Sequence, residues 1–311
     1  MKKILVTPRS LSKGGDPALD MLTKEGFEVV FSTPGKMPLE NELIRLLPGC
    51  VGYLAGIEPI TAAVLESATD LKVISRNGTG INTIDRQAAK RLNIEILRAE
   101  GANARGVAEL TLGLILSLIR SITFSDAFMK QKKWERRKGL ELQGRTLGLI
   151  GCGKIGQLVS RLALAFGMKV LAYDAFPDRN FAPGSDFRFA ELDNVLAESE
   201  IISFHCPEQP AGRAILDRER LDRLKPGVFI VNTARSSLID ETAIRKALQD
   251  GRVAGLALDV FDREPPEATP LLLDDRVIVT PHIGGFTSES VSRATLAAVE
   301  NLLIYLKGNK S

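Results

Sequence analysis

This 311-residue chain has only two histidines, so each can be considered in turn as a group for proton transfer. His282 stands in P-H-I-G-G-F-T, a glycine-rich segment that follows a short apolar run. An imidazole titrates near neutral pH, so it can accept or release a proton during a reaction. His205, in F-H-C-P, also follows an apolar run, and a purely structural role is the alternative for either histidine.

Charged side chains end two other apolar runs. Arg235 closes V-N-T-A-R, and Asp259 closes A-G-L-A-L-D, with Glu264 shortly after it and before two prolines. Because the carboxyl ends of parallel strands lie along one edge of a sheet, these groups are expected to converge with His282 on one crevice. That convergence favours a chemical role for His282 over a structural one.

A glycine pattern indicates what else binds at this edge. The sequence T-L-G-L-I-G-C-G-K-I-G contains Gly151-x-Gly153-x-x-Gly156. Leu147–Ile150 before it is typical of a buried strand, and Gln157–Phe166 after it has apolar residues at helical spacing. Between a strand and a helix, such glycines permit a tight turn, a close approach to a diphosphate and close helix packing. We therefore expect a dinucleotide diphosphate at the helix N-terminus, where free N–H groups attract anions.

The next apolar run supports the same interpretation. Lys169–Tyr173 ends in Asp174, 18 residues beyond Gly156. A carboxylate about 20 residues after the glycines is placed to accept hydrogen bonds from ribose hydroxyls. Because it would repel the 2′-phosphate of NADP, the sequence predicts NAD as the cofactor. The alternative is a glycine-rich turn in another kind of α/β protein.

Taken together, the glycine pattern with Asp174, N-T-A-R, A-L-D-V-F-x-x-E-P and P-H-I-G-G-F-T resemble the D-isomer-specific 2-hydroxyacid dehydrogenase family. The resemblance spans nearly the whole chain and is strongest to the catalytic portion of D-3-phosphoglycerate dehydrogenases. It implies Arg235, Glu264 and His282 as the catalytic set and Arg76, Asn77, Gly78, Thr79 and Gly80 as a substrate-binding loop. It also implies cofactor contacts from Gly151, Gly153, Lys154, Ile155, Gly156, Asp174, Cys206, Pro207, Thr233, Ala234, Arg235, Asp259, His282, Gly284 and Gly285.

The chemistry of the three catalytic candidates fits that implied activity. Oxidation of a 2-hydroxy acid needs a base for the hydroxyl proton while hydride leaves C2 for the nicotinamide. His282 can be that base, and Glu264 can orient it and favour the imidazolium that forms. Arg235 can bind the substrate carboxylate through its planar guanidinium and polarise the carbonyl.

Departures from the family pattern concern the substrate. A basic residue usual in the loop after the third strand is absent from Ala55–Thr61, A-G-I-E-P-I-T. Arg76, or basic residues near Trp134 of a neighbouring subunit, are candidates to replace it. Ser236 stands where the family usually has Gly, and Asn82 stands where it usually has Asp. Because the sequence ends at Ser311, no C-terminal regulatory domain is expected.

Three functions follow from these observations. The first is an NAD-dependent dehydrogenase with 3-phosphoglycerate as substrate and a place in serine biosynthesis. The second is a reductase of glyoxylate, hydroxypyruvate or another 2-oxo acid. The third is a non-catalytic, NAD-sensing scaffold like the corepressors among the family's relatives. Turnover of NADH with a panel of 2-oxo acids discriminates all three.

The elements that must position these groups alternate between strands and helices along the whole chain, which predicts parallel sheets covered on both faces. We expect an α/β protein of two Rossmann-like or flavodoxin-like domains, with the active site in the cleft between them. Residues 1–100 with 285–311 are predicted to form the substrate-binding domain. Residues 101–284 are predicted to form the NAD-binding Rossmann domain, including the crossover helix.

One long apolar pattern, Ala104–Met129, has few helix breakers and predicts a single buried helix. Its Ala108–Ile119 part, together with the family resemblance, predicts a homodimer, and burial within its own domain is the alternative. The final helix is expected over Thr287–Leu306, with Thr287 as its N-cap.

Composition excludes several other classes. The net charge is +3 with scattered basic residues, which gives no reason to expect a nucleic-acid partner. The densest basic stretch, Lys130–Lys138, is expected to be a solvated helix face or a groove near an anionic ligand. Three cysteines form no disulfide or metal pattern, so a reducing, cytoplasmic setting is expected with no metal. Neither a signal peptide nor an apolar run of membrane-spanning length is found, so no membrane partner is expected.

Overall fold

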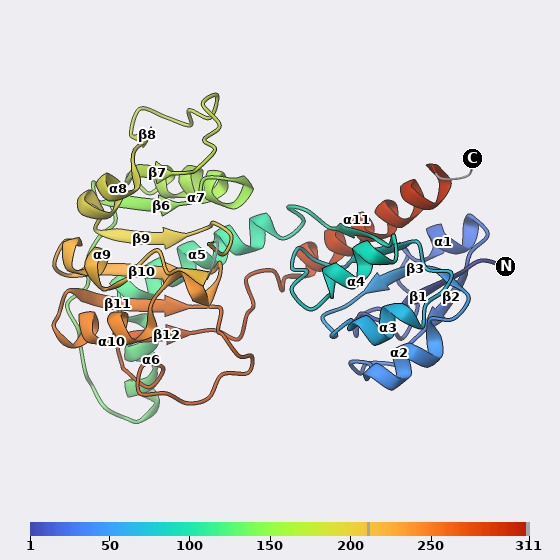
Figure 1. Ribbon diagram of the computed structural model, residues 1–311. Helices are drawn as coiled ribbons and strands as arrows, with labels where there is room; N and C mark the ends of the chain where they lie inside the picture. The colour runs from blue at the N-terminus through green and yellow to red at the C-terminus, as the bar shows by residue number, and fades with distance from the viewer. Residues whose placement is uncertain (210–211, 309–311) are drawn as a thin grey trace. The chain divides into compact units, whose positions relative to one another are not determined.

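The computed structural model describes residues 1–209 and 212–308 and separates into two compact units (Figure 1). One unit comprises Met1–Asn103 and Thr287–Ser311, and the other comprises Ala104–Phe286. Each is built on one parallel sheet with helices on both faces. The predicted α/β class with two parallel-sheet domains is confirmed.

The first unit has the strand order β2-β1-β3-β4-β5, the flavodoxin-like order. Its strands are β1 (Lys3–Val6), β2 (Glu28–Phe31), β3 (Cys50–Ala55), β4 (Val73–Arg76) and β5 (Glu95–Arg98). Its helices are α1 (Asp20–Lys24), α2 (Glu40–Leu46), α3 (Ala62–Glu66), α4 (Arg86–Arg91) and α11 (Ser288–Gly308). Apolar residues of α2, α3 and α4 cover one face of the sheet, and those of α1 and α11 cover the other. The C-terminal helix is therefore part of this core.

The second unit has the order β12-β11-β10-β9-β6-β7-β8. Its strands are β6 (Thr146–Ile150), β7 (Lys169–Tyr173), β8 (Phe187–Phe189), β9 (Ile201–Phe204), β10 (Val228–Asn232), β11 (Val253–Leu258) and β12 (Val277–Val279). Its helices are α5 (Ala104–Ile119), α6 (Ile122–Lys130), α7 (Lys154–Ala165), α8 (Leu192–Glu198), α9 (Arg218–Arg223), η2 (Ser236–Leu238) and α10 (Glu241–Gln249). The chain order reverses between β6 and β9, as in a Rossmann sheet, and this is the place where such sheets bind dinucleotides.

The prediction of a single helix over Ala104–Met129 is wrong. The helix ends at Ile119, and Ser121 takes a left-handed backbone conformation with φ of 50° before α6 begins. Periodicity hides this break, because the apolar pattern continues through it without a glycine or proline. The apolar residues of α5 lie in the core of their own unit, among residues of β6, β10 and β11. The sequence left two explanations for the apolar residues of α5, a dimer contact or burial within its own domain. The burial described here corresponds to the second.

No single helix among the described residues is both long and apolar enough to cross a bilayer. The bent pair α5 and α6, at 65° to each other, meets the length and composition criteria only when taken together.

Most other expected elements are present, with ends that differ by a few residues. Thr287 caps α11 as predicted, because its hydroxyl accepts from the Ser290 backbone N–H at 3.1 Å. The short β8, α9 and η2 were not predicted from the sequence. Elements of three to six residues carry too few apolar positions to show a period.

Candidate active site

The predicted site residues of the second unit lie at the carboxyl ends of six neighbouring strands. Along the edge of the sheet, His282 follows β12, Asp259 follows β11 and Arg235 follows β10. Cys206 and Pro207 follow β9, the glycine loop follows β6 and Asp174 follows β7. The acid–base candidates therefore lie on one side of the β6–β9 switch point, and the predicted ribose-binding acid lies on the other.

The glycine loop has the backbone geometry that its sequence requires. Gly151 has φ of 99°, and a Cβ there would come within 2.6 Å of the His205 backbone. Gly156 lies in the first turn of α7, where a Cβ would overlap the Gly151 carbonyl. At Gly153, by contrast, a Cβ would meet nothing within 4 Å, so the space above the helix N-terminus is open. A diphosphate bound there would be held by the N-terminus of α7, whose first turn contains Lys154 and Ile155.

Alanine at Gly153 and alanine at Gly156 should distinguish an effect on cofactor binding from an effect on helix packing. Gly156→Ala is expected to lower the free energy of unfolding by about 1–3 kcal/mol, because the added methyl has no room against the Gly151 carbonyl. Gly153→Ala is expected to leave stability unchanged and to weaken NADH binding, because only a bound diphosphate would meet its methyl. Thermal unfolding and NADH fluorescence titration check both. Equal losses of stability in the two variants would contradict this account.

Asp174 is fixed at the end of β7 by two backbone groups. Its Oδ2 accepts from the Cys152 N–H at 2.7 Å, and its Oδ1 accepts from the Phe176 N–H at 2.9 Å. The first contact ties the carboxylate directly to the glycine loop. A negative charge thus stands beside the loop, in the position that the sequence predicted for ribose recognition.

Removal of that charge should change cofactor choice. Asp174→Ala is expected to weaken NADH binding and to raise kcat/KM for NADPH relative to NADH by about tenfold, since one repulsive charge near the 2′-phosphate disappears. Steady-state kinetics with both cofactors measure the ratio. Asp186→Ala, which removes an exposed carboxylate between β7 and β8, is the matched control. An unchanged ratio in Asp174→Ala would remove Asp174 from cofactor discrimination.

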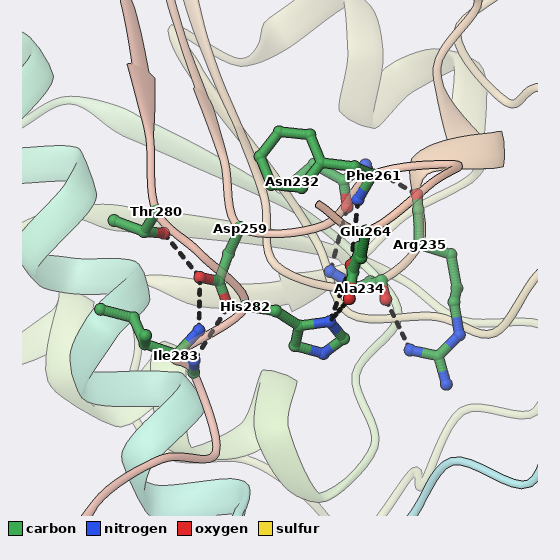
Figure 2. Close-up of polar contacts among 10 residues, drawn as sticks. Asn232, Ala234, Arg235, Asp259, Phe261, Glu264, Thr280, His282 and Ile283 are labelled. Carbon is green, nitrogen blue, oxygen red and sulfur yellow. Dashed lines mark hydrogen bonds and ion pairs between the residues drawn. The ribbon is translucent and has the colours of Figure 1, made fainter. Parts of the chain in front are cut away.

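His282 and Glu264 are in direct contact (Figure 2). The imidazole Nδ1 lies 2.8 Å from both carboxylate oxygens of Glu264. The His282 side chain is 53% exposed, so the other ring nitrogen is accessible to a substrate. The backbone of His282 has φ of 52°, an uncommon conformation for a non-glycine residue. This arrangement can exchange a proton at Nε2 while Glu264 stabilises the imidazolium.

Asp259 holds the loop that carries His282. It is 1% exposed. Its Oδ1 accepts from the Thr280 hydroxyl at 2.6 Å and the Ile283 N–H at 2.8 Å, and its Oδ2 accepts from the Gly284 N–H at 2.9 Å. Donors on both sides of His282 are thus attached to one buried carboxylate (Figure 2). Thr280 was not among the predicted site residues.

Arg235 follows β10 in a turn that is stabilised by hydrogen bonds of the Asn232 side chain. The Asn232 side chain accepts from the Ala234 N–H at 3.0 Å and donates to the Arg235 carbonyl at 2.7 Å. The guanidinium Nη1 donates to the Ala234 carbonyl at 2.6 Å. Thr233 in the same turn contacts Thr111 of α5, with 3.2 Å between their hydroxyl oxygens. Asn232 was not predicted as a site residue, although an Asn between a strand and a turn is a recognisable signal.

His205 is unsuited to proton transfer. Its Nε2 lies 2.9 Å from the Ser203 hydroxyl, and its Nδ1 is buried without a partner. Burial lowers the pKa of His205 to about 3, so the ring stays neutral in the working range. Burial likewise raises the pKa of the Cys152 and Cys206 thiols to about 11. Of the two histidines, only His282 has the exposure and the acidic partner of an acid–base group.

The predicted substrate loop belongs to the first unit. Arg76 is the last residue of β4 and is buried, and Asn77–Gly80 form the loop that follows. The Asn77 N–H donates to the Ala55 carbonyl at 2.9 Å, and its side-chain amide lies 3.5 Å from Thr295 of α11. The loop is thus fixed against β3 and the C-terminal helix.

In the part of the chain that the structure describes, no group of three or more His, Cys, Asp or Glu side chains is arranged to hold a metal ion. The features that fit NAD are the open space at Gly153, the helix N-terminus and the carboxylate of Asp174.

Comparison with protein families identifies the second unit. Residues 112–284 match the family model described as D-isomer specific 2-hydroxyacid dehydrogenase, NAD binding domain. Among curated proteins, the hydroxypyruvate reductase of Thermotoga maritima is 40% identical over 91% of this chain and 92% of its own length. The D-3-phosphoglycerate dehydrogenase of Archaeoglobus fulgidus is 35% identical over 99% of this chain, which covers 58% of that protein. The chain thus spans only about half the length of such phosphoglycerate dehydrogenases.

Solved structures show the same fold. The TT0316 protein of Thermus thermophilus has a TM-score of 0.85 at 36% identity, covering 98% of this chain and 97% of its own. The D-lactate dehydrogenase of Escherichia coli has a TM-score of 0.82 at 27% identity, covering 98% and 97%.

Proposed function

The chain belongs to the D-isomer specific 2-hydroxyacid dehydrogenase family, whose members are NAD-dependent oxidoreductases, and we propose that it transfers hydride between C2 of a small D-2-hydroxy acid and NAD. The observation that carries the proposal is the contact of His282 with Glu264 at the same sheet edge as the glycine loop. When bound, NAD supplies the hydride acceptor or donor.

The residues of this chain supply binding, orientation and the proton. His282 takes the hydroxyl proton in the oxidising direction and returns it to the carbonyl oxygen in the reducing direction. Glu264 holds the ring and stabilises its protonated form. Arg235 binds the substrate carboxylate and polarises the carbonyl. Asn77–Gly80 in the first unit are proposed to contact the substrate as well.

The proposed cofactor contacts follow the order of the strands. The glycine loop holds the diphosphate, and Asp174 accepts from the ribose hydroxyls. The other proposed contacts are Lys154, Ile155, Cys206, Pro207, Thr233, Ala234, Arg235, Asp259, His282, Gly284 and Gly285. Residues 101–284 are accordingly proposed to be the NAD-binding domain, and residues 1–100 with 285–311 the substrate-binding domain.

Two substrate classes are candidates. The phosphoglycerate dehydrogenases among the relatives support 3-phosphoglycerate, which would place the reaction in serine biosynthesis. The hydroxypyruvate reductase relative, of which the chain spans 92%, supports hydroxypyruvate or glyoxylate. The absence of a basic residue from Ala55–Thr61 also favours this second class.

The decisive experiment is a substrate panel with the purified protein. NADH oxidation is followed with 3-phosphohydroxypyruvate, hydroxypyruvate, glyoxylate and pyruvate, and NAD reduction with the corresponding D-2-hydroxy acids. We expect turnover with at least one acid and a preference for NADH over NADPH. Tight NADH binding without turnover of any acid would instead support the non-catalytic scaffold.

We also propose a homodimer in the cytoplasm, without nucleic-acid or membrane partners. Large apolar side chains remain exposed on α6 and the segment after it: Ile122 at 53%, Met129 at 53% and Trp134 at 77%. These exposed apolar side chains, close together in the chain, support the proposed interface. A solution mass of one chain would contradict the dimer.

A further inference from the structure

A buried carboxylate lies at the edge of the first sheet, next to the proposed substrate loop. Glu58, in the loop after β3, is 1% exposed. Its Oε1 accepts from the Tyr53 hydroxyl at 2.7 Å, from the Gly56 N–H at 2.8 Å and from the Thr7 hydroxyl. Charged side chains are rarely buried unless their hydrogen-bonding capacity is used, and here three donors converge on one oxygen.

The neighbouring strand places a guanidinium at the same edge. Arg76 ends β4, where it stands in register with Ala55 of β3. It is 7% exposed, and its Nη1 donates to the Ala55 and Asn77 carbonyls at 3.3 Å each. Its Nε is buried without a partner, as is the side-chain oxygen of Asn77. The start of the substrate loop is therefore lined by polar groups with unused hydrogen-bonding capacity.

Glu58 and Arg76 influence each other electrostatically. Burial lowers the pKa of Arg76, and the negative charge of Glu58 counteracts that effect. Burial and the charge of Glu58 together raise the pKa of Tyr53 well above its ordinary value, so Tyr53 remains a neutral donor. Both groups hydrogen bond to consecutive residues at the end of β3, Arg76 to the Ala55 carbonyl and Glu58 to the Gly56 N–H, so an acid stands close to the guanidinium before any substrate arrives.

From this arrangement we propose that Glu58 determines the charge of the accepted substrate: it neutralises Arg76 at the substrate edge, so the enzyme selects small 2-oxo and 2-hydroxy acids with one carboxylate and an uncharged tail over phosphorylated ones. A phosphate adds up to two negative charges, and a buried acid nearby repels them with little screening by solvent. With Glu58 absent, Arg76 would attract such an anion. The inference rests on the proposed function and names its substrate class.

The test compares two substrates that differ only in the phosphate. In the wild type, kcat/KM for hydroxypyruvate should exceed that for 3-phosphohydroxypyruvate by about tenfold or more, because Arg76 offers the phosphate no net positive charge and Glu58 repels it. Glu58→Gln keeps the size and the acceptor oxygen and removes the charge, so this ratio should fall by about tenfold. Tyr53→Phe removes one hydrogen bond to Glu58 and keeps the charge, so the ratio should stay unchanged.

Two further measurements complete the design. Glu66→Gln, on the exposed surface of α3 in the same unit, is the matched control for loss of an acid and should leave the ratio unchanged. Binding of D-glycerate and 3-phosphoglycerate to the NAD-loaded wild type, measured by calorimetry, does not depend on whether any variant folds. D-glycerate should bind more tightly.

Each result has a definite meaning. Tighter binding or faster turnover of the phosphorylated compound by the wild type overturns the inference, as does an equal change of the ratio in Glu58→Gln and Tyr53→Phe. The absence of turnover with every acid overturns the proposed function instead, and the binding comparison then still decides the charge selectivity.

Discussion

His282→Ala is expected to lose about 10²- to 10⁴-fold in kcat, the usual contribution of a positioned acid–base group, while NADH affinity stays within about twofold of the wild type. The imidazole is exposed at the end of its loop and contacts Glu264, so its removal deletes the proton-transfer group without opening the core. Stopped-flow or steady-state NADH oxidation with the best substrate of the panel measures the loss, and fluorescence titration measures NADH binding.

Neighbouring carboxylates supply the controls for this prediction. Glu264→Gln keeps a hydrogen-bonding partner for the ring and removes the charge that stabilises the imidazolium. We therefore expect a loss of kcat that is smaller than in His282→Ala. Glu267→Gln, in the same loop, removes an exposed acid that is ion-paired with exposed Arg263, and should retain wild-type activity. Normal kcat in His282→Ala would remove the imidazole from the mechanism and leave the proton donor to be sought elsewhere.

Asp259→Ala should damage both stability and turnover. The buried carboxylate accepts three hydrogen bonds from Thr280, Ile283 and Gly284, and each such bond contributes about 1 kcal/mol. We therefore expect the free energy of unfolding to fall by about 3 kcal/mol or more. Because these donors flank His282 on both sides, the ring should also lose its fixed position, and kcat should fall by at least about tenfold.

Chemical denaturation and steady-state kinetics check the two parts separately. Asp262→Ala, which removes an exposed acid three residues further along the same loop, is the matched control and should change neither quantity. If Asp259→Ala were as stable as the control, the three hydrogen bonds would not hold the loop. If it were destabilised but fully active, the loop would not position His282.

The sequence alone was sufficient for the fold class, and it also predicted the residues of the nucleotide-binding end of the site. Alternation of apolar strands and helical patterns is a local property, and it predicted two parallel-sheet units. The glycine pattern is also local, because a tight turn and a close helix approach leave room for no Cβ at Gly151 or Gly156. Asp174 follows at a spacing that one strand–helix–strand unit fixes.

For the catalytic candidates, the sequence predicted which residues to consider but not their geometry. His282, Glu264 and Arg235 were predicted as a set because the family resemblance that their segments carry implies it. Their geometry was not predictable, because it depends on which strands are neighbours and on backbone angles that no periodicity encodes. The left-handed backbone of His282 and the attachment of its loop to Asp259 are two such features, which the sequence did not predict.

At two other places, the tertiary structure differs from the sequence pattern or shows something that the pattern does not contain. The apolar period continues from α5 into α6, yet the helix breaks at Ser121, where a local backbone turn outweighs helix propensity. Glu58 in sequence is an acid in a surface-type loop, and only the fold shows it buried against Tyr53 and Thr7. Sequence patterns determine which residues face a core or form a turn, because those are contacts between near neighbours in the chain. Long-range packing decides which polar groups meet, because only the assembled sheet brings the ends of distant strands together.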